Sequence, residues 1–111
     1  DDASVRLGLA RLLRAAERNH AAAALQLATA YRDQIVPPDA AAAARWLRRA
    51  AELGNVNAQY AMGRAYEGEG RLFALDQSSA VAWYELALAN GASQAAQDLA
   101  RLGATPSGAP R

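Results

Sequence analysis

A spacing of 37 residues between two tryptophans constrains the fold of this chain more than any other feature. Trp46 is followed by Trp83, and the residue types around the first tryptophan recur around the second. The recurring set is an acidic residue, two alanines, the tryptophan and a closing glycine: Asp39, Ala43, Trp46, Ala50 and Gly54 become Asp76, Ala80, Trp83, Ala87 and Gly91. Self-similarity at a period of about 20 to 50 residues is typical of repeat architectures. The register therefore predicts a repeat protein.

A second register of 35 residues relates the segments that precede the tryptophans. Leu27 and Tyr31 fall on Met62 and Tyr66 in this register. Each repeat thus contains two related segments, which predicts a helix pair recurring every 35 to 37 residues. One pair alone leaves its apolar stripe uncovered, so successive pairs are expected to stack.

Apolar residues follow a 3.6-residue period along the chain, with no strand-like alternation. Six helical segments are predicted, at 3–18, 21–34, 39–53, 56–68, 76–90 and 92–102. Asp39 and Asp76 are placed as helix N-caps, and Gly54 and Gly91 as left-handed residues that end a helix. The predicted fold class is all-α: a short right-handed α-solenoid of antiparallel helix pairs.

Aromatic and arginine residues divide the predicted helix pairs into a packed side and an exposed side. Trp46 shares a stripe with small residues on segment 39–53, while Arg45, Arg48 and Arg49 take the other side. We expect the tryptophans and tyrosines to pack between helix pairs. Two further residues, each three positions before an aspartate cap, are expected to pack under the turns: Val36 and Phe73.

The repeat residues resemble a known family. Residues 58–91, AQYAMGRAYEGEGRLFALDQSSAVAWYELALANG, resemble the Sel-one-like repeat family (SLR), which is related to tetratricopeptide repeats. Residues 23–54 resemble it more loosely, with Ala28 where the family has glycine. The residues that carry the pattern, and that we expect to be structural, are Ala23, Leu27, Tyr31, Asp39, Trp46, Gly54, Ala58, Met62, Gly63, Tyr66, Asp76, Trp83 and Gly91.

The 111-residue length predicts one domain over residues 1–103. Its repeat pairs are placed at about 22–54 and 58–91, with capping helices at 3–18 and 92–102. The Pro- and Gly-containing residues 104–111 are predicted to be a flexible tail.

Few residues in the chain offer catalytic chemistry. There is no cysteine, and His20 is the only histidine, so neither a thiolate or histidine-based metal site nor a Ser-His-Asp triad can be assembled. Gly68-Glu69-Gly70 lacks the lysine and hydroxyl of a phosphate-binding loop and is read as a turn. We therefore predict a protein that is not an enzyme and has no catalytic residues, metal or cofactor.

The charge and hydropathy of the chain exclude two classes of partner. The net charge is +1, which argues against a nucleic-acid surface, and no apolar run is long enough for membrane insertion. The resemblance implies that the first helix of each pair lines a concave groove that binds a partner peptide or helix. The expected partner-binding residues, led by Tyr60 and Arg64, are Leu25, Thr29, Arg32, Asp33, Asn57, Tyr60, Arg64, Glu67, Gln94, Gln97 and Arg101.

The expected function is a non-enzymatic protein–protein interaction module acting as an adaptor, scaffold or regulator. The resemblance implies a bacterial envelope, secretion or exopolysaccharide system, so a periplasmic or envelope-associated location is favoured over the cytoplasm. Two alternatives remain open from the sequence. One is a carbohydrate- or peptidoglycan-binding domain that holds an anionic glycan on its arginine faces, at Arg11, Arg14 and Arg18 or at Arg45, Arg48 and Arg49. The other is a structural spacer from a longer repeat array.

Overall fold

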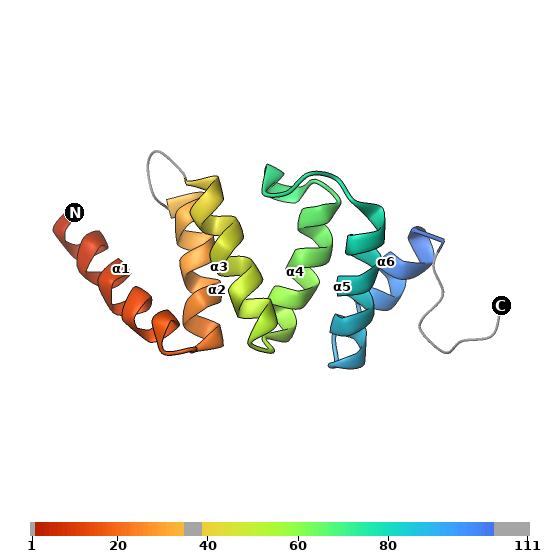
Figure 1. Cartoon of the computed structure of the whole chain (residues 1–111), viewed down its shortest axis with the longest axis horizontal. Coiled ribbons are helices and arrows are strands. Elements are labelled where there is room, and N and C mark those ends of the chain that lie inside the picture. The colour runs from red at the N-terminus through yellow and green to blue at the C-terminus, as the bar shows by residue number, and fades with distance from the viewer. Residues whose placement is uncertain (1, 35–38, 104–111) are drawn as a thin grey trace. The chain divides into compact units, whose positions relative to one another are not determined.

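The computed structural model of this chain describes residues 2–34 and 39–103. Its elements are α1 (Asp2–Glu17), α2 (Ala21–Thr29), the π-helical η1 (Ala30–Gln34), α3 (Ala40–Glu52), α4 (Val56–Tyr66), the 3-10 turn η2 (Glu69–Arg71), α5 (Gln77–Ala89) and α6 (Ala95–Arg101). Figure 1 labels α1 to α6. No strand occurs in these two described ranges, which confirms the all-α class and the six predicted helices. Val36, Pro37-Pro38 and the predicted tail 104–111 lie outside the described residues.

The predicted helix ends are confirmed by backbone geometry in both repeats. Asp39 Oδ1 accepts a hydrogen bond from Ala42 N at 3.0 Å, and Asp76 Oδ1 accepts one from Ser79 N at 3.2 Å. These bonds satisfy amide groups that have no partner inside the first turn of a helix. After the helices, Gly54 and Gly91 take φ angles of 99° and 109°, a region that favours glycine.

A further backbone bond links the two sequence registers. The N–H of Asp39 donates to the carbonyl of Tyr31 at 2.9 Å, and the N–H of Asp76 donates to that of Tyr66 at 3.0 Å. In each repeat, the same backbone bond therefore joins the tyrosine before the internal loop to the aspartate after it.

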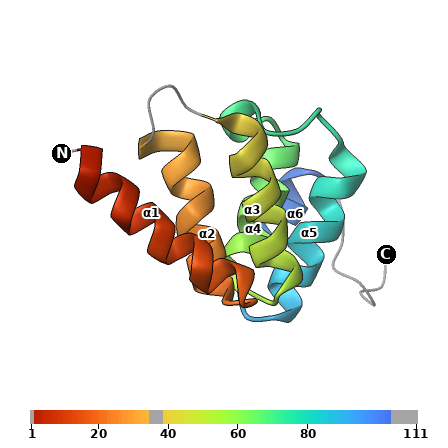
Figure 2. The same cartoon turned by 60° about the vertical axis from the view of Figure 1, so that its left-hand side comes forward.

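The chain divides into two compact units, residues 1–55 and 56–111. In the first unit α2 packs against both α1 and α3, and α2 and α3 run antiparallel side by side (Figures 1 and 2). The contact between these helices is lined by small residues together with Leu27, which is fully buried. Alanine faces let helix backbones approach closely. The buried core residues on α2 and α3 are Ala23, Ala24, Leu27, Ala28, Ala42, Ala43, Ala44, Leu47, Ala50 and Ala51.

In the second unit α5 packs against both α4 and α6. The largest side chain in its core is Tyr84, which is fully buried and which the sequence analysis did not single out. Its neighbour Trp83 is only half-buried, as is Trp46 in the first unit. Phe73 stacks on Tyr66 with ring centroids 4.7 Å apart, which confirms its predicted packing at the turn. One buried cluster contains Ala80, Tyr84, Ala87, Ala92, Ala95 and Leu99.

Candidate functional site

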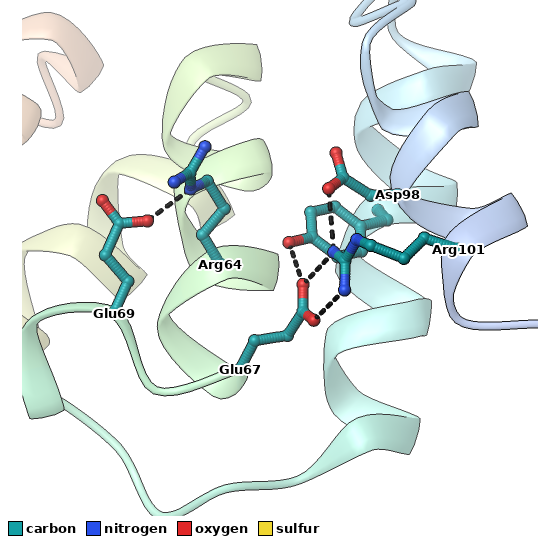
Figure 3. Close-up of a pocket in the computed structure, with 6 residues that line it drawn as sticks. Arg64, Glu67, Glu69, Asp98 and Arg101 are labelled. Carbon is teal, nitrogen blue, oxygen red and sulfur yellow. Dashed lines mark hydrogen bonds and ion pairs between the residues drawn. The ribbon is translucent and has the colours of Figure 1, made fainter.

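The second unit contains a polar cavity of about 360 Å³. Its lining comes from four elements and from the turn that follows α4, and it is drawn in Figure 3. We call this cavity the second-unit site and define it by Arg64, Glu67, Glu69, Tyr84, Asp98 and Arg101.

The turn after α4 places two acidic side chains at this site. Gly68 and Gly70 have φ angles of 108° and 72°, so the chain reverses direction within a few residues of the end of α4. Such angles are accessible to glycine at low steric cost. The reversal brings Glu69 back to Arg64, and these two side chains form an ion pair in Figure 3. The prediction that Gly68-Glu69-Gly70 is a turn is confirmed.

Arg101 joins α6 to the end of α4. Its Nη1 and Nη2 donate to Glu67 Oε2 and Oε1, each at 2.8 Å, and Nη2 also donates to Asp98 Oδ1 at 2.9 Å. Tyr84 donates its hydroxyl to Glu67 Oε1 at 2.5 Å (Figure 3). Glu67 therefore accepts from both an arginine fork and a buried tyrosine. Bidentate charge-assisted pairs of this kind fix geometry better than single contacts do.

Tyr60 contacts two of the residues that line the site. Its hydroxyl donates to Asp98 Oδ2 at 2.5 Å, and its ring lies 5.4 Å from the ring of Tyr84. Tyr60 is half-buried and packs against the core of the second unit. Part of the Tyr60 side chain is therefore used in packing within the second unit, and its expected role in partner binding stays a prediction.

The contacts within the site shift the pKa values of Glu67 and Tyr84. The hydrogen bonds from Arg101, and then from Tyr84, lower the pKa of Glu67 below its usual value. Burial, followed by the hydrogen bond to Glu67, raises the pKa of the Tyr84 hydroxyl. Both pKa values move further from pH 7, whereas a general acid or base works best with a pKa near the working pH. Glu67 stays an anion and Tyr84 stays a neutral donor.

The described residues also bear on metal binding and on membrane insertion. No group of three or more His, Cys, Asp or Glu side chains within residues 2–34 and 39–103 is placed to hold a metal ion. In the same residues no helix combines the length and apolar character needed to cross a membrane.

The family model of the Sel1 repeat matches the chain at residues 21–55 and 56–91. The chain belongs to the Sel1 repeat family. Sel1 repeats are helical solenoid repeats, generally non-catalytic, that generally mediate protein–protein interactions. The first match covers α2, η1 and α3, and the second covers α4, η2 and α5. No curated protein and no solved structure matches the chain.

The second Sel1 repeat and α6 bring together four of the expected partner-binding residues. Arg64, Glu67 and Arg101 line the second-unit site, and Tyr60 supports it. The other expected residues of this unit are exposed but do not line the cavity: Asn57, Gln94 and Gln97.

The expected residues of the first Sel1 repeat lie elsewhere. Leu25 and Thr29 line an apolar cavity of about 410 Å³ in the first unit, where the Thr29 hydroxyl donates to the Leu25 carbonyl at 3.2 Å. Arg32 and Asp33 form an ion pair with each other at 2.9 Å, and the Arg32 guanidinium lowers the pKa of Asp33. Whether any of these residues contacts a partner stays a prediction.

Three residues of the second-unit site were not expected to bind a partner: Glu69, Tyr84 and Asp98. Asp98 precedes Arg101 by three positions on one helix, a spacing that puts the two side chains on one face and was visible in the sequence. The bond between Tyr84 and Glu67 joins different elements and has no comparable local signal.

We predict that Glu67→Gln reduces the pH dependence of stability at acid pH. A carboxylate whose pKa is lowered in the folded protein stabilises the fold at pH values above its pKa in the unfolded chain, here 4.5. This contribution is lost as the pH falls through the pKa of the folded protein. Glu67 is 23% exposed and Arg101 54%, so we expect a modest contribution of about 1 kcal/mol.

Thermal unfolding followed by circular dichroism between about pH 7 and pH 3 measures this effect, because the contribution of Glu67 appears as a slope of Tm against pH. The Tm of Glu67→Gln should start below that of the original protein and converge with it as the pH falls. Glu52→Gln is the control, because Glu52 is an exposed carboxylate of the first unit. Parallel Tm curves for Glu67→Gln and the original protein would contradict the prediction.

Proposed function

We propose that this Sel1 repeat protein is a non-enzymatic adaptor that binds a helix or loop of a partner protein at the second-unit site. The observation that carries the proposal is the exposure of two arginines held in fixed positions beside acidic groups. Arg64 is 53% exposed and Arg101 is 54% exposed. Arginine and tyrosine are enriched among residues that dominate protein interfaces.

The Arg64–Glu69 pair is the element of the site best suited to exchange with a partner. Both side chains are about half exposed, and exposed ion pairs are worth at most about 1 kcal/mol. A partner carboxylate can therefore replace Glu69 on Arg64 at little cost. Arg101, by contrast, is fixed by Glu67 and Asp98, so it presents its remaining surface without loss of side-chain entropy.

The setting we propose is a bacterial envelope, secretion or exopolysaccharide system, with the protein periplasmic or envelope-associated. This part of the proposal rests on the use of similar repeat proteins as adaptors in such systems. Fractionation of the source organism tests it, and recovery of the native protein from the cytosol alone would refute it.

We predict that Arg64→Ala weakens partner binding by about tenfold or more, the effect of losing an interface residue worth roughly 1–2 kcal/mol. The partner is captured from the source organism with the original protein, and its affinity for purified variants is measured by calorimetry. Tyr60→Phe should weaken binding less, because it keeps the packed ring and removes only the hydroxyl bonded to Asp98.

Arg11→Ala is the matched control, since Arg11 is an exposed arginine on α1 that lines none of the cavities described here. Its affinity should equal that of the original protein. If Arg64→Ala also binds the partner with unchanged affinity and has unchanged helical content, the second-unit site is not the partner site.

A further inference from the structure

The first unit contains a second cavity, of about 330 Å³, that the proposed adaptor site does not use. The end of α1 and the turn that follows it form one wall through Glu17 and Asn19, and α3 forms the other. Trp46 lines the cavity together with Arg45, Arg48 and Arg49. We call it the tryptophan cavity.

We propose that the tryptophan cavity binds an acidic peptide segment of a partner protein. An apolar side chain of the segment packs on the Trp46 ring, and neighbouring carboxylates pair with Arg45 and Arg49. This would be a second contact surface of the adaptor, made of different residues from the second-unit site.

The walls of the cavity are held in place before any ligand arrives. Arg49 Nη2 donates to Asn19 Oδ1 at 2.5 Å, a bond between side chains 30 positions apart in the sequence. Asn19 itself takes a φ of 65°, a left-handed conformation that asparagine tolerates better than most residues. The guanidinium carbon of Arg45 lies 5.9 Å from the Trp46 ring centroid. Preformed walls lower the entropy cost of binding.

The charges at the cavity favour an acidic ligand. Within residues 2–34 and 39–103, neither Arg45 nor Arg49 forms an ion pair: the acceptor of Arg49 is a neutral amide, and the contact of Arg45 is an aromatic face. Their positive charges therefore have no direct carboxylate partner. The planar guanidinium group is well shaped to bind a carboxylate through two parallel hydrogen bonds. Residues 1–55 also carry eight arginines against six acidic residues, whereas residues 56–111 carry four against five.

The size and lining of the cavity favour a peptide over a polymeric anion. About 330 Å³ accommodates one large apolar side chain with its flanking backbone, at the low end of the roughly 300–1,000 Å³ of ligand pockets. Single-stranded nucleic acid is typically held by several aromatic residues along a basic groove, and this cavity has one aromatic residue and two glutamates, Glu17 and Glu52.

Peptide selection on the Trp83→Phe protein tests the proposal, because this variant leaves Trp46 as its only fluorescent tryptophan. A displayed library of random heptapeptides is selected on it. We expect enriched peptides that combine Asp or Glu with Leu, Phe, Tyr or Trp. A synthetic peptide of the enriched sequence without tryptophan should change Trp46 fluorescence saturably, and its affinity should fall as salt is added.

Three variants in the Trp83→Phe background decide whether this cavity is the binding site. Arg45→Gln should weaken the peptide at least tenfold, whereas Arg11→Gln should not change its affinity. Arg64→Ala should also leave it unchanged, so failure of this proposal is distinguishable from failure of the second-unit site. The proposal is overturned if no peptide is enriched, if enriched peptides are basic or uncharged, or if Arg45→Gln has no effect. Tighter binding of a heparin hexasaccharide at Trp46 would assign the cavity to a glycan instead.

Discussion

Gly63→Ala should destabilise the second unit by about 2–3 kcal/mol, the upper part of the range for overpacked cores. A Cβ at position 63 of α4 would lie 2.5 Å from Cε1, 2.6 Å from Cδ1 and 2.9 Å from Cζ of Tyr84. All three distances are shorter than real contacts of this kind. The ring cannot retreat easily, because Tyr84 is fully buried and its hydroxyl is bonded to Glu67.

Urea denaturation followed by circular dichroism measures this loss. Gly8→Ala is the matched control, because Gly8 lies within α1 and a Cβ there meets nothing within 4 Å. Replacing a helical glycine in open space should stabilise the protein by roughly 0.5–1 kcal/mol. The two substitutions are chemically identical, so opposite signs isolate the contact with Tyr84. A Gly63→Ala protein as stable as Gly8→Ala would show that the close approach of α4 and α5 does not exist.

The same contact explains a difference between the two Sel1 repeats. The 35- and 37-residue registers place Ala28 and Leu47 of the first repeat where the second has Gly63 and Tyr84. All four residues are buried. In the second repeat a large ring thus faces a residue without a Cβ, whereas the first repeat has a smaller side chain and an alanine at the equivalent positions. The sequence register identified Gly63 as structural, but only the packing of Tyr84 gives the physical reason.

The features of the fold that could be predicted are those encoded over short distances. The caps at Asp39 and Asp76 and the left-handed Gly54 and Gly91 depend on backbone groups within one helical turn. The register of the tryptophans was likewise readable, because each repeat reuses the same local signals. The burial of Tyr84 in preference to Trp83 was not readable. Both are adjacent aromatics on α5, and their relative burial is set by how α4 and α6 pack against that helix.

The second-unit site was only partly predictable for a related reason. Arg64, Glu67 and Arg101 were identified because the family resemblance implies that the first helix of each pair lines a groove that binds a partner. Tyr60 was identified in the same way, but its ring also packs against Tyr84 of α5 and the buried cluster of the second unit. The partners Tyr84 and Asp98 lie 17 and 38 positions from the residues they contact. No local pattern encodes a contact over those separations.

Leu99→Ala should be the most damaging substitution for the second-unit site, with a stability loss of about 2–5 kcal/mol. α6 has only seven residues, and helices this short are not stable alone in water. It is held by the buried Ala95 and Leu99, of which Leu99 is much the larger. Because Asp98 and Arg101 lie on the same short helix, loosening it withdraws both side chains from Tyr60 and Glu67.

Amide hydrogen exchange measures this effect directly, since local opening appears as faster exchange in one segment. In Leu99→Ala we expect faster exchange across α6, together with loss of partner binding at the second-unit site. Leu99→Met should cost less than about 1.5 kcal/mol and keep α6 protected, because it nearly conserves volume. Leu86→Ala is the control for the loss of a leucine, because Leu86 is 43% exposed on α5 and its truncation leaves little cavity.

If α6 stays protected in Leu99→Ala while Asp98 and Arg101 keep their contacts, the ion pairs rather than the buried leucine hold this helix. In that case Arg101→Ala, and not Leu99→Ala, should release it.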